Sequence, residues 1–275
     1  STSVFGSIQI SKDSVIYTNG KSTNQLTVQD HMVGPVISDP LITRGLVDGT
    51  TPLLRNRPAV AYNIYKEQLV LFGGGGGMMP LSIEITDQEL INYPLQNDLW
   101  LLDLSGDKVW RSIIVAYDRP SPSPRTGHIG VIDQSKNYMI IHGGTTSDKK
   151  VTTETWVLNL QQTPPVWSLM STTGLQVAKT FHTALSLKDR RIIVTHGTSV
   201  NETRKIDSNT HYLEYTLSGT TSSGEWKSVN IAGTTKPPDR THHAAVLRLG
   251  SIMVIFGGII HTMDAVTAAT AATAA

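Results

Sequence analysis

The chain has 275 residues, with 23 basic and 22 acidic side chains and no cysteine. Its charges are scattered without a basic stripe or an acidic tail, which argues against nucleic acid or an anionic membrane surface as the partner. The lack of cysteine excludes disulfides, thiolate metal sites and cysteine nucleophiles over this stretch. The longest apolar run, residues 251–260, is too short to cross a bilayer.

One pattern returns five times along the chain: a short apolar stretch, a polar turn, a second apolar stretch and then a glycine. Each stretch holds a few residues rich in valine, isoleucine, leucine and phenylalanine between turn residues, which predicts short buried strands rather than helices. The glycines lie between 53 and 70 residues apart, a period typical of propellers, solenoids and arrays. They are Gly20, Gly73, Gly143, Gly197 and Gly257.

A second element follows the glycines of the three middle copies. It runs over residues 98–104, 155–160 and 212–217, and a tryptophan follows each run after a polar turn, at Trp110, Trp167 and Trp226. A hairpin connects two such strands most simply. Each copy is therefore expected to hold four antiparallel strands, termed a, b, c and d in chain order. Such units close radially into a propeller.

These motifs together resemble the kelch repeat, in which proline and arginine precede a histidine, an apolar hairpin ends in Gly-Gly, and an aromatic strand and a spaced tryptophan follow. The best matches are Pro124-Arg125-Thr-Gly-His128 and Asp239-Arg240-Thr-His-His243. The resemblance implies an all-β kelch-type β-propeller of four-stranded antiparallel blades. At least five blades are expected, and the whole could be an incomplete six- or seven-blade propeller.

The expected propeller spans residues 1–262, with units near 5–57, 58–122, 123–178, 179–239 and 240–262. Several positions depart from the repeat: Pro58 replaces the histidine, and Thr198 replaces the second glycine. Strands c and d are hard to find in the first unit, between Asn24 and Arg55, and are not visible in the fifth. Residues 263–275 are interpreted as an Ala/Thr-rich tail or linker, because such small side chains cannot fill a blade core.

The repeated residues are expected to serve the fold. The glycine pairs suit positive φ and close backbone approach, whereas a phosphate cradle would need a helix to follow them. The histidines invite a zinc or copper site, yet equivalent residues of different blades usually lie apart, so a hydrogen bond from strand a to its neighbours is favoured. The tryptophans are expected to be core wedges. This structural set is Gly73, Gly74, Gly143, Gly144, Gly257, Gly258, His128, His182, His243, Trp110, Trp167 and Trp226.

The long and uneven connections are the b–c loops and the d–a crossovers, which emerge at the same end of an up-and-down blade. Function usually lies on variable loops carried by a rigid scaffold, so the binding surface is expected there. The insertion after Gly73–Gly77 brings methionine and tyrosine, which suit an adaptable contact surface. The candidate binding residues are Met78, Met79, Tyr93, Tyr117, Arg119, Lys149, Lys150, Arg204, Lys205 and Lys236.

The expected function is a non-catalytic scaffold that binds another protein or a peptide, without a cofactor or metal. The alternatives are a cell-surface or secreted carbohydrate-binding module, a kelch-type enzyme, or a purely structural ectodomain. Missing cysteine excludes the cysteine–tyrosine chemistry of kelch-like copper oxidases. The third b–c loop contains Glu202, Asp207 and His211, a set similar to the iron ligands of kelch-type specifier proteins. The first spacing is one residue too long, so no iron site is expected.

A few features of the sequence bear on the compartment of the protein. The sequence opens without methionine or an apolar signal core, as a processed protein or a fragment does. Many serines and threonines and the sequon at Asn201 favour a secreted or cell-surface protein that is glycosylated, and a cytoplasmic protein is the alternative.

Overall fold

The computed structural model describes residues 6–9, 14–18, 23–29, 32–33, 52, 55–76, 94–116, 118–133, 135–199, 209–218, 221–232, 236–248 and 252–260. These residues form strands and turns and no helix. Within these ranges no helix is long and apolar enough to cross a membrane. The prediction of an all-β fold is confirmed.

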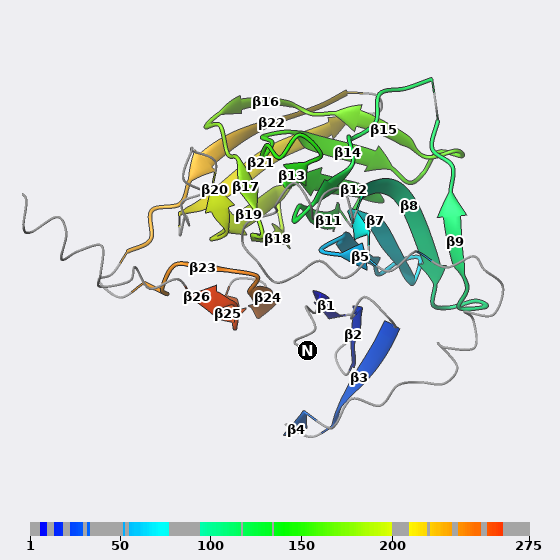
Figure 1. Ribbon diagram of the computed structural model, residues 1–275, viewed down its shortest axis with the longest axis horizontal. Coiled ribbons are helices and arrows are strands. Elements are labelled where there is room, and N and C mark those ends of the chain that lie inside the picture. Colours follow the sequence, from blue (N-terminus) through cyan, green and yellow to red (C-terminus); the bar gives the residue numbers. More distant parts are fainter. Residues whose placement is uncertain are drawn as a thin grey trace, which may run out of the picture.

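The strands form five antiparallel blades that follow one another around the molecule in chain order (Figure 1). Blade I holds β1 (Gly6–Gln9), β2 (Ser14–Thr18), β3 (Thr23–Gln29) and β4 (Met32–Val33). Blade II holds β6 (Ala59–Asn63), β7 (Gln68–Gly76), β8 (Leu95–Asp103) and β9 (Trp110–Ile113). Blade III holds β11 (Ile129–Asp133), β12 (Tyr138–His142), β14 (Thr155–Asn159) and β15 (Val166–Leu169). Blade IV holds β18 (Thr183–Leu187), β19 (Arg191–Thr195), β21 (Thr210–Ser218) and β22 (Thr221–Ser228).

Blade V is a hairpin of β24 (Ala244–Arg248) and β25 (Ile252–Phe256), and no third strand pairs with β25 among the residues that the structure describes. Blade I corrects one expectation, because β3 and β4 supply the strands c and d that the sequence did not reveal. β3 lacks the apolar run by which the strands of the other copies are recognised, because Thr23–Gln29 is mostly polar.

Short two-residue strands join the start of strand a to the segment after strand b in blades II to V. In blade II, β5 (Arg55–Asn56) pairs with the end of β7. The others are two-stranded sheets of β10 (Arg125–Thr126) with β13 (Thr145–Thr146), β17 (Lys179–Thr180) with β20 (Thr198–Ser199), and β23 (Arg240–Thr241) with β26 (Ile259–Ile260). This shared register makes Arg55, Arg125, Lys179 and Arg240 equivalent residues.

The register also corrects the alignment of the fourth unit. The two residues before the short outer strand have φ of 63° and 101° at Gly73–Gly74 and 69° and 91° at Gly143–Gly144. His196–Gly197 has a similar pair of φ values, 55° and 94°. His196 therefore replaces the first glycine, and Gly197 is the second, whereas the sequence had suggested that Thr198 replaced the second glycine.

The core lies between successive blades, so a middle strand is covered on both faces. All five residues of β12 are buried for this reason. Two of the tryptophans predicted to be core wedges lie in these layers. The ring centroids of Trp167 and Phe72 are 4.9 Å apart between blades II and III, and those of Trp226 and His142 are 4.4 Å apart between blades III and IV. Trp110 is buried with Leu69 on the opposite face of blade II.

One further strand, β16 (Ser171–Gly174), departs from the expected antiparallel plan. It lies in the crossover from blade III to blade IV and pairs in parallel with the outermost strand, β22. Ser171 lies opposite Ser223 and Gly174 opposite Trp226. Blade IV thus becomes a five-stranded sheet whose rim is covered by the chain that has just left blade III (Figure 1).

Candidate functional site: the face of the b–c and d–a connections

The residue that follows each short inner strand has a positive φ in all four described blades that carry this strand. Arg57, Gly127, Phe181 and His242 have φ between 55° and 68°. The Gly127 amide donates to the Arg57 carbonyl at 3.2 Å, the Phe181 amide to Gly127 at 2.8 Å, and the His242 amide to Phe181 at 3.2 Å. Backbone hydrogen bonds therefore pass from blade to blade around this end of the propeller. We call these four residues the axial chain.

Side chains reinforce the axial chain. The Arg57 guanidinium lies 4.3 Å from the centre of the Phe181 ring, and the His242 ring stacks on Phe181 at 4.6 Å with an interplanar angle of 20°. Gly127 adjoins this stack, because a Cβ there would lie 2.4 Å from Thr180 Oγ1 and 2.6 Å from the Phe181 ring. The equivalent positions of the other blades hold a side chain at similar φ, so glycine is required here because Thr180 and the Phe181 ring occupy the space of a side chain.

Three of the four equivalent basic residues, Arg55, Arg125 and Lys179, are buried and hold the ends of strands a and b together. Arg125 is completely buried and donates to the Gly143 carbonyl at 3.3 Å and to the Glu154 carboxylate at 2.5 Å. Arg55 likewise donates to the Gly73 carbonyl at 3.1 Å and binds the Asp98 carboxylate with both terminal nitrogens. These charge-assisted bonds fix the rim from which the b–c and d–a connections emerge.

Each carboxylate also accepts a hydrogen bond from a tryptophan two residues further along strand c. Trp100 Nε1 donates to Asp98 at 2.6 Å, and Trp156 Nε1 donates to Glu154 at 2.9 Å. Burial opposes ionisation, but the bonds to Arg125 and Trp156 outweigh it and lower the pKa of Glu154. The sequence signal for this arrangement was visible as Arg55 and Arg125 together with Asp98-x-Trp100 and Glu154-x-Trp156, but it was not recognised.

The predicted histidines lie at the blade interfaces. The His128 ring meets the edge of Phe72 at 5.6 Å, and the His182 ring meets His142 at 5.8 Å. His243 Nε2 forms a hydrogen bond of 2.7 Å with Thr183 Oγ1, which ties strand a of blade V to strand a of blade IV. Desolvation, aided by nearby cations, lowers the pKa of His128 and His243 to about 3. These imidazoles are therefore neutral at physiological pH.

Metal coordination is not indicated by the histidines. Among the described residues no group of three or more histidine, aspartate or glutamate side chains is arranged to hold a metal ion. His211 lies on β21, but Glu202 and Asp207 fall outside the described ranges.

Four of the predicted binding residues lie in the described connections, and all four are exposed or partly exposed. Arg119 is in the crossover before blade III, where it lies 3.8 Å from Asp118. Lys149 and Lys150 form the turn after β13, and Lys150 lies 3.3 Å from Asp148. Lys236 is in the crossover before blade V. The other candidates and the sequon lie outside the described residues: Met78, Met79, Tyr93, Tyr117, Arg204, Lys205 and Asn201.

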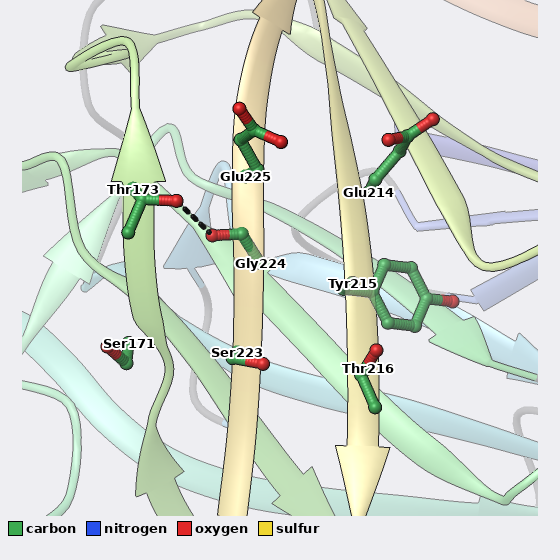
Figure 2. A pocket seen from close by; sticks show the side chains of 8 residues that line it. All are labelled: Ser171, Thr173, Glu214, Tyr215, Thr216, Ser223, Gly224 and Glu225. Atoms are coloured by element: carbon green, nitrogen blue, oxygen red, sulfur yellow. Dashed lines mark hydrogen bonds between the residues drawn. The ribbon is translucent and has the colours of Figure 1, made fainter.

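A hollow of about 360 Å³ lies elsewhere, on the outer strands of blade IV (Figure 2). Hydroxyl groups of β16, β21 and β22 line it together with Glu214 and Glu225 (Figure 2). Both carboxylates are engaged by Lys227 Nζ, at 2.7 Å and 3.0 Å. Because Lys227 already pairs with both carboxylates and the hollow lies on the rim of one blade, we place the candidate site at the axial chain and the connections around it.

Known proteins match both the sequence and the fold. Residues 59–269 match the family model described as the KLHDC2/KLHL20/DRC7 Kelch-repeats domain. The chain is 27% identical over 196 residues to Adagio-like protein 3 of Oryza sativa subsp. japonica, covering 70% of this chain and 28% of that protein. It is 26% identical over 197 residues to Adagio protein 3 of Arabidopsis thaliana, with the same two coverages. The chain thus spans little more than a quarter of these relatives' length.

Two solved structures share the fold at low sequence identity. The structure of YjhT superposes with a TM-score of 0.62 at 13% identity, covering 93% of this chain and 72% of that one. A structure of RAG in complex with one melted and one unmelted RSS gives a TM-score of 0.56 at 14% identity, covering 89% and 71%. The expectation of a secreted glycoprotein gains no support from these matches. The repeated strands, the glycine pairs and the matched family model together show that the chain belongs to the kelch-repeat family.

Proposed function

We propose that the protein is a non-catalytic scaffold that binds another protein or a peptide on the face formed by the b–c and d–a connections. The observation that carries this proposal is the axial chain, in which hydrogen bonds join the inner ends of blades II to V. A surface held in place by such a frame loses little conformational entropy when a partner binds. The b–c loops and d–a crossovers, which differ most between blades, lie at the same end of the propeller as this chain. Their variability suits them to determine specificity.

The buried groups near the axis support binding rather than catalysis. The histidines there have a pKa far below neutrality and pack against rings of the adjoining blade, so they are not poised to exchange protons at pH 7. The buried arginines are committed to carboxylates and carbonyls at the blade rims. Contact with a partner is therefore assigned to the exposed side chains of the connections, which include Arg119, Lys149, Lys150 and Lys236.

Charge reversal on the two ends of the propeller tests this proposal. The double variant Lys149→Glu/Lys150→Glu changes the b–c loop of blade III. The matched control, Lys66→Glu/Lys188→Glu, changes exposed lysines in the a–b turns at the opposite end. The immobilised wild-type chain and both variants are used to capture partners, which are identified by mass spectrometry.

We expect a partner captured by the wild type to be retained by the control and lost from the Lys149/Lys150 variant. Circular dichroism and the unfolding midpoint should be the same for all three proteins, because every changed side chain is at the surface. Retention of the partner by both variants, or its loss from the control alone, would contradict binding on the proposed face.

A further inference from the structure

A serine hydroxyl in the crossover from blade II to blade III contacts the buried guanidinium of blade III. Ser123 lies two residues before Arg125, and its Oγ accepts a hydrogen bond from a terminal nitrogen of Arg125 at 3.2 Å. Its backbone carbonyl accepts a second bond from Arg125 Nε at 3.1 Å. The same terminal nitrogen donates to the Glu154 carboxylate at 2.5 Å. One nitrogen of Arg125 therefore lies between a serine hydroxyl and a carboxylate.

This hydroxyl is a particular feature of blade III. Among the four blades in which the equivalent basic residue is identified, the others have Leu53, Val177 and Pro238 two residues before it. In blade V the backbone bond is kept without a hydroxyl, because Arg240 Nε donates to the Pro238 carbonyl at 3.1 Å. The repeat therefore does not require the Ser123 hydroxyl, which is available for another role.

The sequence around this serine suits a kinase that requires proline after the modified residue. The chain reads Ser121-Pro122-Ser123-Pro124. A residue before proline is held extended, and kinases bind their substrates in an extended conformation. Ser123 is exposed, and residues 118–124 form no strand. Pro124 is partly exposed whereas Pro122 is buried, so Ser123 is the better substrate of the two serines.

We propose that Ser123 is a phosphorylation site for a proline-directed serine/threonine kinase, and that its phosphate binds Arg125 in place of Glu154. The kinase transfers the γ-phosphoryl group of ATP. A bond forms between Ser123 Oγ and the γ-phosphorus, and the bond from that phosphorus to the β–γ bridging oxygen breaks. ADP leaves with the electron pair of the broken bond, and the hydroxyl proton passes to the kinase. The modification changes the rim of blade III and does not depend on the partner proposed above.

The receptor for the phosphate is already in place. Arg125 is completely buried, whereas 41% of the Glu154 side chain is exposed. Because Ser123 and Glu154 reach the same nitrogen from the surface, a phosphate on Ser123 can bind the guanidinium while it stays in contact with water. The phosphoryl group adds about two negative charges and several acceptor oxygens, which a guanidinium binds strongly. Repulsion between the phosphate and the carboxylate then displaces Glu154 from Arg125.

Phosphoryl transfer to the folded chain tests the site. The full chain, Ser123→Ala and the matched control Ser121→Ala are incubated with ATP and a purified mitogen-activated protein kinase, and the phosphate is located by mass spectrometry. We expect one phosphate on Ser123 in the wild type and in Ser121→Ala, and no phosphate in Ser123→Ala. Circular dichroism checks that both variants fold, which is expected because both side chains are exposed.

A synthetic peptide of residues 118–126 shows whether the fold itself presents the serine. Transfer to the folded chain as well as to the peptide supports the proposal. Transfer to the peptide alone would overturn it, since the serine would then be reached only outside the fold. Phosphate on Ser121 of the folded chain, or no transfer to either substrate, would also overturn it.

The contact between the phosphate and Arg125 is tested by the NMR signals of two indole groups. Trp156 Nε1 donates to Glu154 at 2.9 Å, and Trp100 Nε1 makes the equivalent bond to Asp98 at 2.6 Å in blade II. Phosphorylation should shift the Trp156 signal, because Glu154 leaves Arg125, and should leave the Trp100 signal in place. A Trp156 signal that stays unmoved would contradict the displacement of Glu154.

The variant Glu154→Gln distinguishes a phosphate that binds Arg125 from one that only adds charge. In this variant the guanidinium has lost its carboxylate, so the phosphate supplies the missing negative partner. Phosphorylation should therefore raise the urea midpoint of Glu154→Gln more than that of the wild type, in which Glu154 competes for the same nitrogen. An equal change in both proteins would show that the phosphate does not reach Arg125.

Discussion

At the scale of single residues, two glycines with the same left-handed backbone separate the cost of backbone strain from the cost of a steric clash. Gly127 and Gly257 have the same φ of 68°, so an L side chain strains both backbones equally. They differ in surroundings, because Gly127 lies under the Phe181 ring and Gly257 has no neighbour within 4 Å of a Cβ.

Gly127→Ala should therefore destabilise the protein more than Gly257→Ala. The left-handed conformation costs an alanine about 1–2 kcal/mol at either site. Overlap with Thr180 Oγ1 and the Phe181 ring should add roughly 1–3 kcal/mol at Gly127. Urea unfolding followed by tryptophan fluorescence measures both losses, and equal losses would mean that the ring does not occupy the space above Gly127.

The buried histidines give the protein a defined dependence on pH. His128, His142 and His243 have a pKa lowered to about 3, mainly because burial disfavours the charged imidazolium. In the unfolded chain each has a pKa near 6.5, so between these values the unfolded state binds more protons. The contribution of these neutral histidines to the free energy of unfolding is therefore fully present above pH 6.5 and is lost as the pH falls towards 3.

Urea unfolding at pH 7, 6 and 5 should show this loss. Each buried histidine contributes up to about 1.4 kcal/mol per pH unit below its unfolded pKa. His128→Gln should reduce the slope of the free energy of unfolding against pH by the contribution of one histidine. This holds whatever the substitution does to the stability at pH 7. An unchanged slope in this variant would show that His128 is protonated in the folded protein.

At the scale of elements, the rim of each blade depends on a buried guanidinium and its carboxylate. Arg125 is completely buried while Glu154 is partly exposed, so removing the carboxylate leaves a charge that water cannot reach. The same substitution on an exposed pair has no such consequence, since water replaces the lost partner.

Glu154→Gln should lower the free energy of unfolding by about 1–3 kcal/mol, because the buried Arg125 guanidinium loses its charged partner. Glu214→Gln, which removes a carboxylate from the exposed Lys227, should leave the urea midpoint unchanged. A loss in Glu154→Gln no larger than that of the control would show that Ser123 and the Gly143 carbonyl alone satisfy Arg125.

At the scale of the whole molecule, the exposure of equivalent residues shows which blade faces pack against another blade. Phe72 and Phe256 each end a strand b, but the first is buried between blades II and III and the second is 81% exposed. Phe72→Ala should cost about 3–5 kcal/mol, because a large core side chain is lost. Phe256→Ala should stay within about 0.5 kcal/mol of the wild type. Similar losses in thermal or urea unfolding would show that blade V is covered in solution.

The sequence was sufficient to predict the propeller because apolar strand pairs, glycine pairs and tryptophans repeat in one phase. It placed His128, His182, His243 and the tryptophans in equivalent positions, but their packing partners belong to other blades and are not visible along the chain. His196 was misaligned because glycines were matched by residue type, whereas the structure requires a left-handed backbone. β16 was missed because a parallel strand on a rim is determined by tertiary contact rather than by its own residues.

The parallel pairing of β16 with β22 also has a mechanical consequence. The chain leaves the outer strand of blade III and is immediately fastened along the outer strand of blade IV, so those two blades cannot separate without breaking that pairing. Blade V lacks a corresponding strap among its described strands. Under tension applied across the molecule, blades III and IV should detach together as a single piece.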